Sequence, residues 1–223
     1  MIKNISNLGD AAVYCDFGSE VNKMINSNVI VYFNYLSNLV KEKQVEGITN
    51  LTPSYNKLII SFDLNITSYK KIKKIIENLI VQQDIKKKNK KIKVPVCCEE
   101  EYGLDFKRLV KKLNMDKDEI LRLYFNQEYF CYMTGFIAGM PFLGDLNKVI
   151  RCDRLETPRV KVPKGSVGIT EQFANIYTFD SPGGWNIIGN TPKKIFDNKN
   201  FNHPALVNPC LLYTSPSPRD KRQ

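Results

Sequence analysis

Histidine is nearly absent from this chain of 223 residues, in which His203 is the only one. Structural zinc sites draw on several histidines or on cysteines at CxxC spacing, and the six cysteines, at positions 15, 97, 98, 131, 152 and 210, show no such spacing. We therefore expect no metal site. The adjacent Cys97 and Cys98 suit redox chemistry or, more simply, a reduced pair on or beside a strand.

Long apolar runs are absent too, so no segment reaches the length needed to cross a membrane. The first residues, MIKNISNLGDAAVYCDFG, lack the basic flank, long apolar core and small-residue cleavage site of a signal peptide. A hydrophobic content of 43% is enough for ordinary cores in one large domain or two small ones. These features predict a soluble globular protein of the cytoplasm.

Basic residues outnumber acidic ones, and the formal net charge is +10. Ten lysines against Glu77 and Asp84 give the segment from Lys70 to Lys93 a net charge of +8, which leaves +2 for the rest of the chain. The segment has no arginine and few interleaved aromatic residues, so a solvated helix face leading into a surface loop explains it better than a nucleic-acid site. We expect no nucleic acid and no membrane as partner.

The first part of the chain alternates strand and helix patterns. Residues 11–17, 45–51, 57–62 and 91–96 are typical of strands, residues 21–43 carry apolar side chains at helical spacing, and 52–56 suit a turn. Ser68 suits the N-cap of a second helix, whose apolar stripe is Ile72, Ile75, Ile76, Leu79 and Ile80. The order β-α-β-β-α-β predicts a ferredoxin-like domain over residues 1–96, in an α+β protein.

The second part is predicted to be mostly β-structure. Residues 97–128 suit a helical connector of two short helices, 105–113 and one that Asp116 and Glu119 open as a capping box. Short β-rich runs broken by glycine and proline over residues 129–209 indicate a β-barrel or sandwich. The stretch 157–192 holds four of the eleven prolines and five of the twelve glycines, and SPGGW within it carries the only tryptophan. Such density marks tight turns.

We expect the tail, residues 210–223, to have a separate origin. CLLYTSPSPRD back-translates to a DNA sequence that resembles the mosaic end of a transposase-based sequencing adaptor. Such a foreign segment carries no fold information. We expect an adaptor-derived tail that is disordered or poorly packed, and a barrel that is truncated near Pro209 and lacks its last strand.

Several ordered motifs carry a family resemblance. YFCYMTGFIAGMPFLGDL, LETPRVKVPKGSVGI, IYTFDSPGGWNIIGNTPKKIF and HPALV resemble the B subunit of bacterial 5-oxoprolinase. That family is also described as allophanate hydrolase subunit 1, or carboxyltransferase subdomains C and D, and includes the kinase inhibitor KipI. The resemblance implies a ferredoxin-like domain followed by a cyclophilin-like β-barrel.

The same resemblance implies an activity and partners. Family members act with the A and C subunits of 5-oxoprolinase to open 5-oxoproline to L-glutamate at the expense of ATP, which we expect to bind with Mg²⁺. An alternative within the family is a KipI-like protein inhibitor of a sensor histidine kinase. A third possibility is a subdomain of a urea carboxylase or a related biotin-dependent carboxyltransferase.

Site residues follow from the motifs that match. The resemblance implies a catalytic role for Arg159, and substrate or nucleotide contacts for Thr157, Pro163, Gly165, Ser166, Ser181, Pro182, Gly183, Gly184, Trp185 and Thr191. Arg159 suits bidentate binding of a carboxylate or phosphate, or equally a structural link to an acid or carbonyl. The Gly183-Gly184 pair suits close approach to an anion or a tight hairpin turn. Ser166 has no histidine partner, so we expect no nucleophile there.

This chain departs from the family pattern at five positions. Tyr124 stands where histidine is usual, Ala138 and Met140 stand where the family has the proline and phenylalanine of PGF, Glu171 stands where glycine is usual, and Asn190 stands where arginine is common. Loss of the imidazole removes the most obvious acid or base near neutral pH. His203, between Asn202 and Pro204, suits an exposed structural loop.

Overall fold

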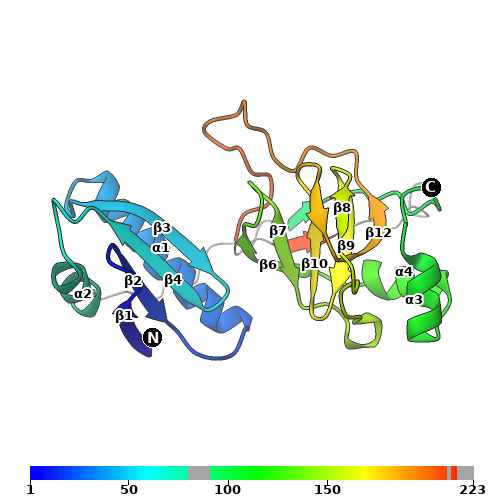
Figure 1. Ribbon diagram of the computed structural model, residues 1–223, viewed down its shortest axis with the longest axis horizontal. Coiled ribbons are helices and arrows are strands. Elements are labelled where there is room, and N and C mark those ends of the chain that lie inside the picture. The colour runs from blue at the N-terminus through cyan, green and yellow to red at the C-terminus, as the bar shows by residue number, and fades with distance from the viewer. Residues whose placement is uncertain (80–90, 210–211, 215–223) are drawn as a thin grey trace. The chain divides into compact units, whose positions relative to one another are not determined.

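The computed structural model describes residues 1–79, 91–209 and 212–214, without the side chains of Leu212 and Tyr213. The chain forms two compact units, Met1–Lys88 and Asn89–Gln223, which are described separately (Figure 1). No helix in the described parts is both long enough and apolar enough to span a membrane.

The first unit is a four-stranded antiparallel sheet with two helices. Its elements are β1 (Asn4–Asn7), β2 (Ala12–Asp16), α1 (Lys23–Lys41), β3 (Ile48–Ser54), β4 (Lys57–Phe62) and α2 (Tyr69–Glu77), and the strand order is β1-β2-β4-β3. Alternation along β2 and β4 buries Val13, Leu58 and Ile60 against the helices' apolar residues.

Local signals explain where α1 lies. The Asn22 side chain accepts a hydrogen bond from the Ile25 N–H (2.9 Å) and so caps the helix start. Val29 and Leu36, seven residues apart, are fully buried on the face that meets the sheet. Asn26 on the same helix donates to the Tyr55 carbonyl (2.6 Å), which ties α1 to the β3–β4 turn.

The strands of this unit differ from the prediction in three ways. The short polar β1 was not expected, because its sequence NISN shows no alternation. Strand β3 continues to Ser54 through Pro53, which the edge position tolerates because an edge strand need not donate every N–H. Residues 91–93 pair in the other unit, so β1 rather than the expected segment 91–96 supplies the fourth strand. The ferredoxin-like order predicted for residues 1–96 is therefore wrong in its last strand.

Ile80 of the predicted helix stripe and the lysines at 86–90 lie outside the described residues.

The second unit contains most of the β-structure. Its elements are β5 (Lys91–Lys93), α3 (Phe106–Leu113), α4 (Lys117–Phe125), β6 (Tyr129–Thr134), β7 (Pro141–Gly144), the 3-10 helix η1 (Lys148–Ile150), β8 (Arg159–Val162), β9 (Ser166–Thr170), β10 (Phe173–Ile176), β11 (Ser181–Gly183), β12 (Asn186–Asn190) and β13 (Leu212–Thr214). Seven strands form one sheet in the order β12-β9-β10-β7-β6-β13-β5, and β11 and β8 form a separate ribbon (Figure 1). The cyclophilin-like assignment stays a prediction.

Helices α3 and α4 belong to the core of this unit, although the sequence suggested a connector. Leu109 on α3 and Ile120 and Tyr124 on α4 are fully buried among strand residues such as Ile169. The predicted start of α4 is confirmed, because the Asp116 carboxylate accepts a hydrogen bond from the Glu119 N–H (2.8 Å).

The tail departs from the expected lack of structure over three residues. Strand β13 pairs antiparallel with β6 and parallel with β5, and Val94 N–H donates to the Thr214 carbonyl (3.0 Å). Strand pairing uses backbone groups, which any strand-forming tripeptide can offer to the strands on either side of it. Residues 210–211 and 215–223 lie outside the described part.

The large sheet buries different residues on its two faces. Ala174 and Ile176 of β10 pack with Leu109 and Ile120 of the two helices, in what we call the helix-side core. Tyr177 packs with Met140, Val162 and Ile187 in a second cluster. Because side chains alternate along a strand, Asn175 projects to the face of the second cluster. This face carries the candidate site.

Candidate functional site

The motifs that are separated in sequence meet in pairs. The turn of PKGSV lies against IGNTP, where Thr191 N–H donates to the Gly165 carbonyl (2.9 Å) and Asn190 Nδ2 donates to the Lys164 carbonyl (2.9 Å). Gly165 has φ of +83°, and a Cβ there would lie 2.5 Å from the Thr191 carbonyl oxygen. Glycine is therefore required by both backbone conformation and close approach.

TPR and SPGGW form the second pair. Strands β8 and β11 place Ser181 opposite Val162 and Gly183 opposite Arg159. A Cβ on Gly183 would lie 2.2 Å from the Tyr177 hydroxyl oxygen, whereas on Gly184 the nearest atom is a Pro158 side-chain carbon at 3.5 Å. Gly183 thus serves the packing of strand β11 on the buried Tyr177 ring.

Arg159 binds a buried acid. Its two terminal nitrogens donate to the two carboxylate oxygens of Asp105 at 3.0 and 2.7 Å, and Asp105 is only 5% exposed. The Ile187 N–H also donates to this carboxylate (2.6 Å), and the Asp105 N–H donates to the Ile187 carbonyl (3.1 Å). Of the two roles considered for Arg159, the structure shows the link to an acid, and its catalytic role stays a prediction.

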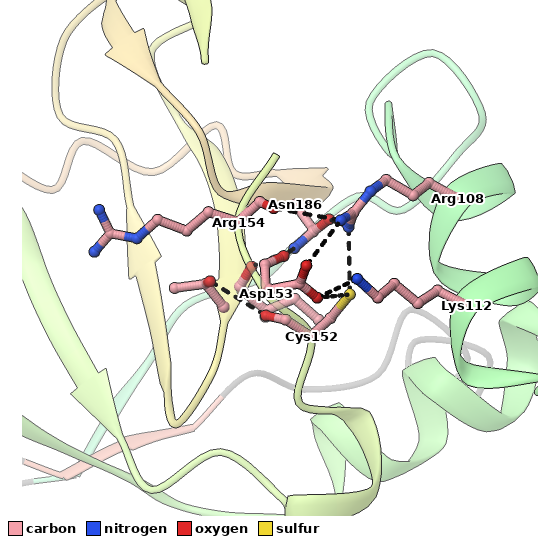
Figure 2. Close-up of polar contacts among 8 residues, drawn as sticks. Arg108, Lys112, Cys152, Asp153, Arg154 and Asn186 are labelled. Atoms are coloured by element: carbon pink, nitrogen blue, oxygen red, sulfur yellow. Dashed lines mark hydrogen bonds and ion pairs between the residues drawn. The ribbon is translucent and has the colours of Figure 1, made fainter. Parts of the chain in front are cut away.

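Asp105 is the N-cap of α3, and Arg108 lies in the first turn of that helix. The Arg108 side chain binds residues 152–154, in the loop that precedes β8 (Figure 2). Its guanidinium contacts Cys152 Sγ (3.3 Å), the Arg154 carbonyl (3.3 Å) and the Asn186 side-chain oxygen. Asn186 in turn donates to the Asp153 carbonyl (2.9 Å), and Lys112 forms an ion pair with the Asp153 carboxylate. The backbone of residues 152–154 is therefore fixed against α3 and β12.

The Arg154 side chain extends away from that cluster (Figure 2). It is exposed, and its guanidinium carbon lies 5.9 Å from the centroid of the Trp185 ring, within the range of a cation–π contact. In the described chain no ion pair or side-chain hydrogen bond is formed by this guanidinium. Trp185 is 6% exposed and meets Phe142 edge-on at 5.6 Å.

Further buried polar residues belong to the same part of the second unit as Trp185. The Asn175 side chain is fully buried and lies against Tyr177, and the buried hydroxyl of Ser181 lacks a hydrogen-bond partner among the described residues. Burial raises the pKa of Tyr177, while the nearby Asn175 side chain and the Trp185 backbone amide oppose the shift. We call Arg154, Asn175, Tyr177, Ser181 and Trp185 the Trp185 site. Its exposed group is the Arg154 guanidinium beside the Trp185 ring, and a cation of this kind suits a small anionic ligand.

The other predicted residues do not form one cluster with it. Thr157, Pro163 and Pro182 are exposed, whereas Ser166 and Thr191 are buried in the sheet and in the turn packed on it. Tyr124 packs against Tyr129 in the helix-side core, with ring centroids 5.1 Å apart. His203 is exposed on the loop after Phe196, as expected.

Two further sequence features have local explanations. Glu171 has φ of +40° in the turn between β9 and β10, which is why glycine suits this position. Cys97 is a free thiol whose backbone pairs with Asn190, and burial raises the pKa of its free neighbour Cys98 to about 12. The pair therefore lies beside strand β12, as predicted, and redox chemistry at these thiols stays a prediction.

Sequence reasoning missed Asp105, Arg108, Arg154, Asn175 and Tyr177. A usable signal existed for Asn175, because a lone amide between Ala174 and Ile176 interrupts an apolar run. The partners of Asp105 lie 54 and 82 residues away, which no local pattern reveals.

Comparison with known proteins covers both units of the chain. The model of the family described as carboxyltransferase domain, subdomain C and D, matches residues 3–207. The chain is 31% identical to the 5-oxoprolinase B subunit of Bacillus subtilis over 215 residues, which cover 91% of this chain and 88% of that protein.

Solved structures agree with this placement. A conserved uncharacterized protein from Pyrococcus horikoshii is 30% identical, with a TM-score of 0.55 and 96% of each chain covered. The urea carboxylase of Kluyveromyces lactis is 20% identical with a TM-score of 0.73, over 95% of this chain and 21% of that one, a likeness that shows the fold alone.

The two glycines of SPGGW make a matched pair. We predict that Gly183→Ala lowers the free energy of unfolding of the second unit by about 1–3 kcal/mol, the usual cost of overpacking, because the buried Tyr177 ring cannot move aside. Gly184→Ala, with its nearest neighbour at 3.5 Å, should leave this free energy unchanged. Chemical unfolding followed by the fluorescence of the single tryptophan tests both variants; equal destabilisation would contradict the steric argument.

The Asp105–Arg159 pair generates a second prediction. Arg159→Ala leaves a buried carboxylate without its cation and should cost about 3–5 kcal/mol of unfolding free energy. The double variant with Asp105→Ala should lose less than the sum of the single losses. Lys161→Ala, which breaks an exposed pair with Asp180 (2.8 Å), is the control and should unfold like the parent protein. Additive losses in the cycle would show that the pair is not coupled.

Proposed function

Because the chain belongs to the carboxyltransferase subdomain C and D family, we propose that it is one subunit of a 5-oxoprolinase, acting with the A and C subunits of that enzyme as partners. This enzyme opens 5-oxoproline to L-glutamate with hydrolysis of ATP. The observation that carries the proposal is the match to a 5-oxoprolinase B subunit over 91% of this chain and 88% of the relative. A match of that extent covers both units rather than a shared module.

The Trp185 site suits the proposed substrate. 5-Oxoproline is a five-membered lactam with one carboxylate, so a cation beside a flat aromatic ring suits it. Arg154 supplies an exposed cation, and Trp185 supplies the indole ring next to it.

The reaction must overcome the stability of an amide. Transfer of a phosphoryl group from ATP to the lactam oxygen would give an activated species that water can open. The proposed role of this chain is to bind and orient the lactam, so that the reacting oxygen is held in one position. We assign no proton transfer to the site, because its only titratable groups are the Arg154 guanidinium and a tyrosine whose pKa is raised by burial.

The nucleotide and its Mg²⁺ fit this chain poorly. Mg²⁺ prefers carboxylate oxygens, and the Trp185 site has none. Within residues 1–79, 91–209 and 212–214 there is no group of three or more histidine, cysteine, aspartate or glutamate side chains that would hold a metal ion. We therefore propose that the partner subunits supply most of the ATP and Mg²⁺ site, and that this chain alone is inactive.

Reconstitution tests the proposed function. The purified chain mixed with the A and C subunits from the same organism should release glutamate from 5-oxoproline only when ATP and Mg²⁺ are present, and should release none by itself. Mixtures that omit one component at a time are the controls. Turnover by this chain alone would overturn the need for partners, and a complete mixture that cleaves no 5-oxoproline would overturn the assignment.

A further inference from the structure

We propose that Arg154 binds the carboxylate of the substrate and thereby restricts the enzyme to lactams that carry a carboxylate on the ring. This inference rests on the proposed function and adds the residue that sets substrate selectivity.

Arg154 differs from the other arginines that the structure describes. Arg159 binds Asp105, Arg108 clamps residues 152–154, Arg122 pairs with Glu119 (3.4 Å) and Arg151 donates to the Leu146 carbonyl (2.9 Å). Arg154 alone in this group has only an aromatic ring as a neighbour for its charge. A guanidinium has five donors in a planar fork, so an oxyanion is the ligand that satisfies it best.

The backbone that carries Arg154 is unusually well fixed for a loop. Arg108 donates to the Arg154 carbonyl (3.3 Å), and the next residue, Leu155, donates its N–H to the Gly184 carbonyl (2.7 Å). The preceding carbonyl of Asp153 accepts from Asn186 (2.9 Å). Three consecutive residues are therefore held, and only the side chain of Arg154 remains to be ordered when a ligand binds, which keeps the entropic cost low.

The ring beneath the guanidinium is fixed as well. Trp185 is 6% exposed, meets Phe142 edge-on and has its Cβ 3.0 Å from the position that a Cβ on Gly168 would take. The cation–π contact holds the exposed Arg154 guanidinium beside a rigid indole, where an anion can reach it from solvent. The side-chain oxygen of the fully buried Asn175 lies 2.7 Å from the same Gly168 position, so the structure behind the ring is closely packed. The guanidinium therefore lies over a rigid surface.

The charge of the site favours a carboxylate over a polyphosphate. A nucleotide triphosphate requires several cations or a glycine-rich loop at a helix start. Here Arg159 is already bound to Asp105, and Lys161 is paired with Asp180 (2.8 Å). One available guanidinium matches one carboxylate, and the ring of 5-oxoproline would then lie beside Trp185.

Kinetics of the reconstituted complex test the proposal with Arg154→Gln and Arg154→Lys. The KM for 5-oxoproline should rise about 10- to 100-fold in Arg154→Gln, the range expected for loss of a charge-assisted hydrogen bond, while the KM for ATP stays within about twofold. Arg154→Lys should recover part of the loss, because it keeps the charge without the fork. Arg122→Gln, an exposed arginine on α4, is the matched control and should behave as the parent.

Selectivity gives the sharper test. The parent complex should turn over 5-oxoproline far better than 2-pyrrolidinone, which has the same ring without the carboxylate, and Arg154→Gln should lose most of this preference. An active parent complex with an unchanged KM for 5-oxoproline in Arg154→Gln overturns the proposal. A rise in the KM for ATP alone also overturns it, because the bound oxyanion would then be a phosphate.

A binding measurement separates this proposal from the proposed function. Trp185 is the only tryptophan in the chain, so its fluorescence reports directly on the site. Titration of the full chain with 5-oxoproline should change this fluorescence in a saturable way, 2-pyrrolidinone should change it only at about 10-fold or greater concentration, and Arg154→Gln should abolish the difference. A response to 5-oxoproline that is identical in parent and Arg154→Gln overturns the role of Arg154 even if the complex releases no glutamate.

Discussion

A buried carboxylate organises the second unit. Asp105, at the start of α3, receives both terminal nitrogens of Arg159 and the N–H of Ile187, so one side chain joins a helix, the β8–β11 ribbon and the large sheet. Such a carboxylate is costly to bury unless every lone pair is used, and here its donors come from elements far apart in sequence. This pairing helps to fix the position of α3, and with it the contacts that Arg108 and Lys112 of α3 make to residues 152–154.

The candidate site depends on that helix position. With Asp105 fixed, Arg108 lies one turn further along α3 and reaches the loop of residues 152–154. The loop uses its backbone and the side chains of Cys152 and Asp153 for attachment, which leaves the Arg154 side chain over Trp185. Two arginines five residues apart thus differ in their contacts. The Arg159 guanidinium is bound by the buried carboxylate of Asp105, whereas the Arg154 guanidinium faces solvent with its donors unused. This division explains why a motif arginine can be structural while its neighbour is left available for the proposed ligand.

The limits of the sequence prediction follow from the range of each interaction. Strand β2, helix α1 and the Asp116 cap of α4 were predicted because alternation, helical spacing and capping are local patterns. The pairing of residues 91–93 with β13 was missed because sheet membership depends on distant backbone groups, and the polar β1 shows no pattern of its own. The family motifs include Ser181 and Trp185, yet Arg154 and Asn175 were missed because the contacts and burial of a side chain depend on residues far away in the sequence.

The Trp185 site is proposed above all to hold the substrate by its carboxylate. A crystal structure of the assembled complex with 5-oxoproline tests this most directly. We predict ligand density with both carboxylate oxygens within hydrogen-bond distance of the Arg154 guanidinium and the lactam ring against Trp185. Density for 5-oxoproline in another part of the complex, with Arg154 still facing solvent, would contradict the proposal.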